Sequence, residues 1–492
     1  MPLNFHDRAS GERIGSSRLA RNVLDAATSE VDPALNSKVL GIQKWRSQYQ
    51  QIFRELAKVE FFQEQNLLEI ARTGLEEISN SIQDETGTKL PQIISAGWSG
   101  REQVETFTVQ GTGTPQQLRI PGISSLTDAA QIWTHENLAE PGLVPSFSFL
   151  DAHKKLPINM DILVALAGAA EYAPTKYWLD MGGTVAVAAR PSTELWADLI
   201  AYARQSAGKL LVPVLKRRLV DETVEISDAE IARKAGLDLV DDASVLASWV
   251  SSIASNNQQR IVLGQYAYAP GAKHILVQAV QDSVAEVMCK KLAPSRVALA
   301  WLATPTDSTA VPARVLEQSL EAHSSRSSKI KLRDALLGMR KIPVAFFDTR
   351  FGEKLALIDP TSPIQGSSYA LAKRSQRWRA YLANSQGVKV SYAVSPPAKT
   401  YSVLSFRALN ATYRGAPMFG LQPFEVADAA IAATAVLLRD LHGPMHSRGS
   451  TSLHTDNAIH GGLWRMMYSP SSVWSRATFL GWKGLFTRRS VG

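Results

Sequence analysis

The chain has 492 residues, of which 45% are hydrophobic and 20% are charged. This composition is typical of a globular protein with a large core, and the length suggests roughly two to four domains or one large elaborated domain. The one cysteine, Cys289, excludes an intramolecular disulfide and favours a reducing compartment. The N-terminal residues lack the apolar core of a signal peptide, and no apolar run approaches the ~20 residues of a spanning helix. We therefore expect a cytoplasmic protein.

The net charge of +8 is unevenly distributed along the chain. Residues 441–492 carry +5, because they hold Asp456 and six basic residues: Arg448, Arg465, Arg476, Lys483, Arg488 and Arg489. A nucleic-acid-binding protein more often has a broad stripe of lysine and arginine, so we expect no nucleic-acid partner. Contact with an anionic cofactor, an acyl carrier or a membrane surface fits this distribution better.

The region before the strands, residues 1–84, is predicted to be an N-terminal arm and a helical region. Residues 1–35 are polar and irregular, whereas residues 36–82 have a helical pattern. In that pattern an apolar face is formed by Trp45, Tyr49, Ile52, Leu56 and Val59. Such a face either packs on its own chain or forms a dimer.

The next region, residues 85–156, carries strand and turn signals. Strands are expected at 92–96 and 106–109, separated by several glycine and proline breaks. We interpret this stretch as a mixed connecting region.

From residue 157 to residue 440, short apolar strands alternate with helices. This alternation argues for a parallel sheet covered by helices on both faces, and so for an α/β fold. Strands are expected near residues 162–168, 182–190, 210–215, 260–264, 296–303, 343–347, 355–359 and 388–394. Helices are expected near residues 175–181, 193–206, 244–254, 271–292, 314–340, 367–384 and 423–440.

Two stretches within this region resemble each other. Residues 292–305 and 382–396 each contain a helix end, a turn, a strand and a proline-containing exit. Either the domain contains a duplicated half, or these are two ordinary αβ units of one sheet.

The most specific chemistry in the chain belongs to Tyr369 and Lys373. They are four residues apart at the start of an expected helix, so they share one of its faces. A lysine ammonium beside a phenol favours the phenolate, which would let Tyr369 donate or accept a proton near neutral pH. The other interpretation is a half-buried tyrosine and a solvated lysine.

The segment around this pair resembles the short-chain dehydrogenase/reductase family, and its ketoreductase-type members in particular. The similar features are Tyr-Ala-Leu-Ala-Lys, the helix and strand that follow, and the exit Pro-Pro-Ala-Lys-Thr at 396–400. The resemblance implies that Tyr369 is the acid/base, and that Lys373 lowers its pKa and holds the nicotinamide ribose. It also implies that the exit wraps the nicotinamide through Ser395, Pro396, Pro397 and Thr400.

The resemblance further implies a Rossmann-like doubly wound parallel sheet, with an N-terminal helical region and a C-terminal extension around it. The sequence departs from the family in two places, the glycine loop of the nucleotide site and the catalytic serine. Of the glycines that let a phosphate approach the backbone, only Gly168 remains, and Glu171 would repel phosphate. Arg190, at the end of the second strand, either meets the 2′-phosphate of NADP or is a solvated strand-end residue. The family's serine is not at its usual distance before the tyrosine, and we expect Ser362 to take its role.

Four of the nine histidines fall between residues 442 and 460. This stretch is interpreted as a loop, because Gly443 and Pro444 disfavour a helix. It is a surface or interface loop with incidental histidines, a loop that contacts substrate, or a metal site formed by His442 and His446; we expect no metal.

The end of the chain alternates aromatic and basic residues. It either lies in a membrane interface, docks a partner protein, or packs on its own chain.

These observations lead to two function hypotheses. The first is a divergent NADP(H)-dependent carbonyl reductase that acts on a small-molecule or acyl-thioester substrate. The second is a catalytically inactive reductase-like scaffold or subunit, which docks a protein partner or another copy through residues 441–492.

Overall fold

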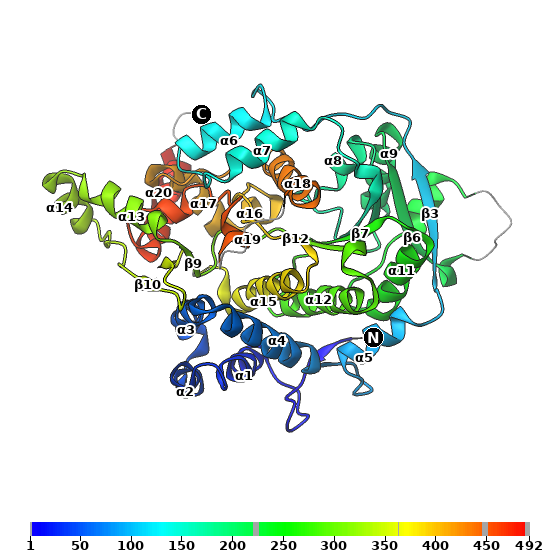
Figure 1. Ribbon diagram of the computed structural model, residues 1–492, viewed down its shortest axis with the longest axis horizontal. Helices are drawn as coiled ribbons and strands as arrows, with labels where there is room; N and C mark the ends of the chain where they lie inside the picture. Colours follow the sequence, from blue (N-terminus) through cyan, green and yellow to red (C-terminus); the bar gives the residue numbers. More distant parts are fainter. Residues whose placement is uncertain (1, 220–225, 363, 445–450, 488–492) are drawn as a thin grey trace.

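A computed structural model describes residues 2–219, 226–362, 364–444 and 451–487 (Figure 1). Its centre is a seven-stranded sheet with the strand order β12-β8-β7-β4-β5-β6-β3. Six strands are parallel, and β3 at one edge is antiparallel to β6. The strands are β3 (Val104–Gln110), β4 (Asp161–Leu166), β5 (Thr184–Ala188), β6 (Lys209–Leu215), β7 (Arg260–Gln265), β8 (Val297–Trp301) and β12 (Lys389–Ser391). The prediction of an α/β fold with a mostly parallel sheet is confirmed.

The strands read as continuous apolar runs because both faces of the sheet are covered. In β4 every residue is buried, and successive side chains enter different cores. Ile162 and Val164 belong to one core, whereas Leu163 and Ala165 belong to the other. Figure 1 shows α11 (Ala243–Asn256), α12 (Lys273–Lys291) and α15 (Gly366–Ser385) on one side of the sheet. On the other side lie α8 (Thr175–Asp180), α9 (Thr193–Gln205) and α18 (Val426–His442).

The chain builds the sheet outward in two directions from its centre. It adds β5 and β6 on one side of β4, returns to place β7 on the other side of β4, and then adds β8 and β12. The strand order therefore reverses between β4 and β7, and the carboxyl ends of strands at such a switch point are where ligands of open α/β sheets bind. The two similar stretches of the sequence contain β8 and β12, which pair directly in parallel.

The N-terminal residues form a helical layer that packs on α15. Its helices are α1 (Ser16–Thr28), α2 (Pro33–Gly41), α3 (Trp45–Phe62) and α4 (Glu64–Asn80), and β1 (Asn4–Phe5) pairs with β2 (Ile82–Gln83). The expectation of an irregular segment up to residue 35 is wrong, because α1 buries Leu19, Val23 and Leu24 on one face. The apolar face of α3 is buried within this chain, where Trp45, Tyr49, Ile52 and Leu56 join the core.

The connecting region contains one strand and several helices. The strand β3 forms where it was predicted, but the strand predicted at 92–96 is wrong, since these residues belong to α5 (Leu90–Trp98). Pro91 in its first turn and the hydrogen bond from the Lys89 amide to Gln92 Oε1 at 3.1 Å favour the start of a helix there. Two further helices, α6 (Leu126–His135) and α7 (Leu143–Ala152), follow, and α10 (Asp228–Lys234) comes after β6.

A long insertion separates β8 from α15. It contains β9 (Thr309–Pro312), α13 (Ala313–Ser324), α14 (Ser328–Leu336), β10 (Phe346–Asp348) and β11 (Lys354–Ile358). The three strands form an antiparallel sheet of their own, in the order β10-β11-β9. The two strands predicted from the sequence here exist, but they lie outside the central sheet.

The chain after β12 forms α16 (Tyr401–Ser405), α17 (Arg407–Gly415), α18, α19 (Ser452–Thr455) and α20 (Pro470–Thr487). Helices α17 and α20 approach closely at glycines: a Cβ added to Gly415 would lie 2.0 Å from the Ala477 carbonyl oxygen. In the described part of the chain, none of the helices is both long and apolar enough to cross a membrane.

Candidate functional site

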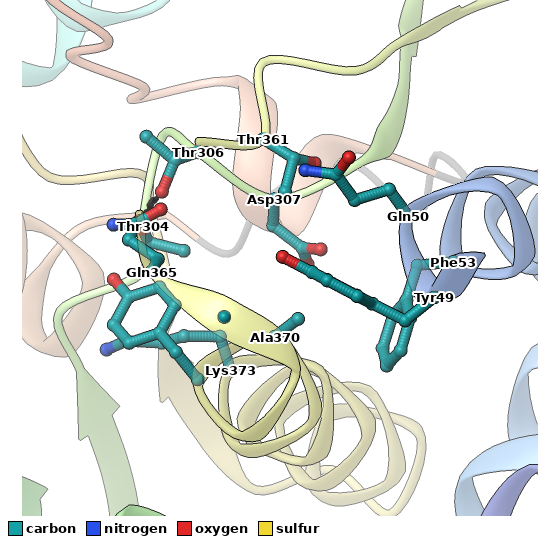
Figure 2. Close-up of a pocket in the computed structure, with 12 residues that line it drawn as sticks. Tyr49, Gln50, Phe53, Thr304, Thr306, Asp307, Thr361, Gln365, Ala370 and Lys373 are labelled. Carbon is teal, nitrogen blue, oxygen red and sulfur yellow. Dashed lines mark hydrogen bonds between the residues drawn. The ribbon is translucent and has the colours of Figure 1, made fainter. Parts of the chain in front are cut away.

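Tyr369 and Lys373 lie in the first two turns of α15 and face the same side. The lysine Nζ is 5.8 Å from the centre of the tyrosine ring. Both side chains line a small pocket at the start of α15, together with residues of α3 and of the loop between β8 and β9 (Figure 2). The other lining residues are Tyr49, Gln50, Phe53, Thr304, Thr306, Asp307, Thr361, Gln365, Gly366 and Ala370.

The pocket is narrow and polar at one end. It has room for about one water molecule. Figure 2 shows Thr304 and Lys373 on one side of the pocket and Tyr49 and Asp307 on the other. A group the size of a carbonyl could enter between them, whereas a larger substrate would have to extend outward past Gln365.

The hydroxyl group beside Tyr369 belongs to Thr304, not to Ser362. Thr304 lines the pocket with Tyr369 and acts to lower the pKa of its phenol, and Thr304 Oγ1 lies 2.8 Å from Thr306 Oγ1. Ser362 is buried and does not line the pocket; its hydroxyl accepts a hydrogen bond from the Ile364 amide at 3.4 Å. The insertion explains the difference, because it separates the end of β8 from α15 in the sequence but not in space.

The environment of Tyr369 keeps its hydroxyl protonated. Burial raises the pKa of this phenol, and the Thr304 hydroxyl opposes the rise only in part. The expectation of a lowered pKa is wrong, because burial raises it. Lys373 Nζ donates to the Leu302 carbonyl oxygen and to Gln376 Oε1, both at 3.1 Å.

Burial also shifts the protonation equilibrium of Lys373 toward the neutral amine. It lowers the pKa of the ammonium to about 8, although the charge of Asp307 acts in the opposite direction. Behind the lysine, Gln376 Nε2 donates to Gln278 Oε1 at 2.8 Å, and Gln281 Nε2 donates to the same oxygen at 3.2 Å. The lysine is thus the outer end of a buried chain of amide side chains, which fixes its position.

His274 on α12 supports the tyrosine ring. Its ring stacks on that of Tyr369 with 5.6 Å between centroids and 14° between planes. The Ala269 amide donates to His274 Nδ1 at 3.3 Å, so the neutral ring carries its proton on Nε2. Burial, with the charge of Lys373, lowers the pKa of His274 to about 3. His274 was not predicted from the sequence. Only its contact with Tyr369, which is distant in the sequence, distinguishes it from the other histidines.

A buried cluster of ion pairs fixes the floor of the pocket. Arg374, next to Lys373 on α15, is fully buried and donates to Glu60 of α3 at 2.7 Å and to Asp307 at 3.1 Å. Arg377 lies 2.6 Å from the other oxygen of Asp307, and Trp378 Nε1 donates to Glu60 at 2.8 Å. The cluster ties together the N-terminal layer, α15 and the loop that carries Thr304.

The residues expected to hold a pyrophosphate lie in the loop between β4 and α8. Gly168 packs tightly there, since an added Cβ would be 2.6 Å from Ala165 Cβ and 2.9 Å from Thr175 Oγ1. Ala167 adopts the left-handed conformation, with φ 61°. The amides of Ala167, Gly168 and Ala170 already bond to backbone carbonyls of the strands and the loop. This loop is a turn with its own hydrogen bonds, and α8 after it has six residues.

The same loop contacts the segment that follows β12. Tyr172 Oη donates to the Pro396 carbonyl oxygen at 3.0 Å, and the Tyr401 amide donates to Glu171 Oε2 at 2.9 Å. The structure thus brings the loop of Gly168 together with the segment that contains Ser395, Pro396, Pro397 and Thr400. Ser395 is buried, and its amide bonds to the Ala303 carbonyl at 2.9 Å, next to Thr304.

Arg190 is separate from these contacts. It is exposed just after β5, and its carbonyl oxygen accepts a hydrogen bond from Trp196 Nε1 at 3.2 Å. Within the described part of the chain, its guanidinium forms no hydrogen bond or ion pair.

The histidines expected in the loop from 442 to 460 do not come together. His442 Nε2 lies 3.1 Å from Asp161, His454 is bonded to Tyr381 and Thr309, and His460 Nε2 lies 3.3 Å from the buried Glu140. His446 lies outside the described residues. Within the ranges that the structure describes, no group of three His, Cys, Asp or Glu side chains could hold a metal ion.

A comparison of the chain with models of protein families finds no match, and a comparison with curated proteins finds no similar protein.

Proposed function

We propose that this protein is a divergent NADP(H)-dependent carbonyl reductase with a Rossmann-like sheet. Numbering the six parallel strands in chain order gives the sheet order 3-2-1-4-5-6, which supports this fold. The observation that carries the proposal is the convergence of Tyr369, Thr304 and Lys373 on one pocket beyond β8. These three side chains are a proton donor, a hydroxyl that can orient a carbonyl, and a cation.

The side chains perform the protonation half of the reduction. A bound nicotinamide would supply the hydride that adds to the carbonyl carbon. The carbonyl oxygen accepts hydrogen bonds from Thr304 and Tyr369, and the Tyr369 hydroxyl gives up its proton to that oxygen as the alcohol forms. The raised pKa of Tyr369 ensures that the phenol holds this proton beforehand. Because burial raises the pKa of Tyr369, the phenolate regains a proton readily once the alcohol has formed.

The site suits the nicotinamide end of a dinucleotide better than it suits the pyrophosphate. Lys373, Tyr369 and the segment from Ser395 to Thr400 suit the nicotinamide ribose and ring, and Arg190 suits a 2′-phosphate. The pyrophosphate would have to pass the loop of Gly168, where Glu171 and Tyr172 are bonded to the segment after β12. The reductase proposal therefore requires that these two hydrogen bonds open when the cofactor enters.

That contact also favours a second candidate function. If the two loops stay bonded to each other, a dinucleotide cannot enter and the domain is a scaffold without catalysis. Such a scaffold would dock a protein partner or another copy through residues 441–492.

The proposal is tested by the substitution Tyr369→Phe, which removes the hydroxyl and keeps the ring that stacks on His274. With NADPH and a panel of ketones and acyl thioesters, we expect turnover to fall by a factor of about 100 to 10,000 while NADPH affinity changes little. The matched control is Tyr177→Phe, on α8 and outside the pocket, which should retain the wild-type rate. Full turnover in Tyr369→Phe would remove this residue from the mechanism.

A further inference from the structure

The insertion between β8 and α15 carries an exposed arm that the proposed reaction does not use. The arm comprises residues 324–344, with α14 at its tip, and Figure 1 shows α14 at the edge of the molecule away from the central sheet. The only buried side chain of α14 is Asp334. This helix therefore presents nearly its whole surface to the surroundings.

Asp334 fixes the orientation of the arm. Its carboxylate accepts a hydrogen bond from Tyr468 and pairs with Arg326 at 3.0 Å and with Arg333 at 2.9 Å. Next to it, the Arg340 amide donates to Ser472 Oγ at 3.2 Å. These bonds attach one side of the arm to the start of α20, so the opposite side of α14 has a defined outward direction.

The outward face of α14 carries an apolar crest, formed by Leu332 and Leu336. Leu332 is 64% exposed and Leu336 is 80% exposed, and one helical turn separates them. Leu337 and Val344, which follow on the arm, are 54% and 59% exposed. Leu332 and Leu336 lie together on one face of α14, and such a group of large apolar side chains marks a contact surface, whereas single exposed ones need no explanation.

Basic side chains flank this crest. Residues 324–341 hold six basic residues and one acidic residue, a net charge of +5 in a chain whose total is +8. Lys329 is exposed and lies on the same side of α14 as Leu332 and Leu336, at helical spacing, whereas the exposed Arg333 pairs with Asp334. The single acidic side chain, Asp334, is turned inward and neutralised by its arginine partners.

We propose that this arm docks the protein on an anionic lipid surface. Leu332 and Leu336 lie on the outer face of a projecting helix and not on the floor of a groove, so a flat layer can contact both at once. Leu332 and Leu336 enter the boundary between headgroups and acyl chains, and the basic side chains remain at the level of the phosphates. The charge of the arm is complementary to such a surface, which attracts basic segments. In this contact the arm lies on the surface of the lipid layer and does not cross it.

The test uses the full chain and vesicles of phosphatidylcholine alone or of an equimolar mixture with phosphatidylserine, in a sedimentation assay. The wild-type protein should bind the anionic vesicles, more weakly as salt is raised, and should bind the neutral ones far less. Leu332→Ser with Leu336→Ser should weaken binding at least about tenfold, and Lys329→Glu about fivefold. Because all three side chains are exposed, these variants should fold as the wild type does.

The matched control is Leu40→Ser, which removes a leucine that is 62% exposed on α2, away from the arm. It should bind anionic vesicles as tightly as the wild type. Equal binding of the arm variants and the wild type would overturn the proposal, because it would place the contact elsewhere in the chain. Failure of the wild-type protein to prefer anionic vesicles would also overturn it, as would a concentration-dependent dimer that the leucine substitutions abolish and vesicles do not affect.

Discussion

The substitution Arg374→Met tests how the pocket is held together. Arg374 has no exposed surface, and it donates to Glu60, to Asp307 and to the carbonyl oxygens of Phe53 and Ser308. Methionine fills much of the same volume but leaves two buried carboxylates with one cation fewer. Removing one partner from a buried ion pair costs about 3–5 kcal/mol. Since Arg377 still reaches both carboxylates, we expect a loss near the lower end of this range.

Urea unfolding followed by tryptophan fluorescence measures this loss, because the buried Trp378 lies within the cluster. The control is Arg72→Met, since the Arg72–Glu69 pair is exposed and such pairs contribute about 0–1 kcal/mol. The double variant Glu60→Leu with Arg374→Met should lose less than the sum of the two single losses, as it removes both charges together. A loss below about 1 kcal/mol for Arg374→Met would refute the view that this cluster holds the layers together.

Three further predictions concern the site. For Lys373, the folded pKa of about 8 lies below the ordinary 10.5, so between these values the unfolded chain holds more protons and stability rises with pH. The rise should be at most about 3 kcal/mol by denaturation at successive pH values, and Lys373→Met should abolish it. Glu171→Gln keeps an acceptor for the Tyr401 amide but removes a negative charge, so calorimetry should show NADPH binding about fivefold tighter. Glu194→Gln, on α9, should leave the affinity unchanged, and an equal gain in both variants would contradict the reasoning. Thr304→Val should lower the turnover number about 10- to 100-fold; an unchanged rate would exclude a role for this hydroxyl.

The central sheet could be predicted from the sequence because its strands are local and apolar. Strands buried on both faces give uninterrupted runs such as residues 161–166, and helices of ordinary length separate them. The pair Tyr369 and Lys373 was placed correctly on one face of a helix for the same reason. Helical spacing is a local property that tertiary contacts seldom change.

The errors concern features that depend on contacts distant in sequence. Ser362 was expected to take the role of the family's serine, whereas the hydroxyl beside the phenol is that of Thr304, on the far side of a folded insertion. The expected direction of the Tyr369 pKa shift was wrong because the folded chain buries the phenol, which raises its pKa. The strand expected at 92–96 failed because helix-start signals at Pro91 outweigh a short β-branched run.

As a reductase, the protein must let a nicotinamide dinucleotide reach Tyr369 past the loops that follow β4 and β7. Titration of the purified protein with NADPH, followed by the fluorescence of the nicotinamide, tests it most directly. The account predicts saturable binding of NADPH, with NADH weaker because Arg190 has no phosphate to meet. Absence of NADPH binding at millimolar concentrations would contradict the reductase proposal and leave the closed, non-catalytic scaffold as the function that the geometry supports.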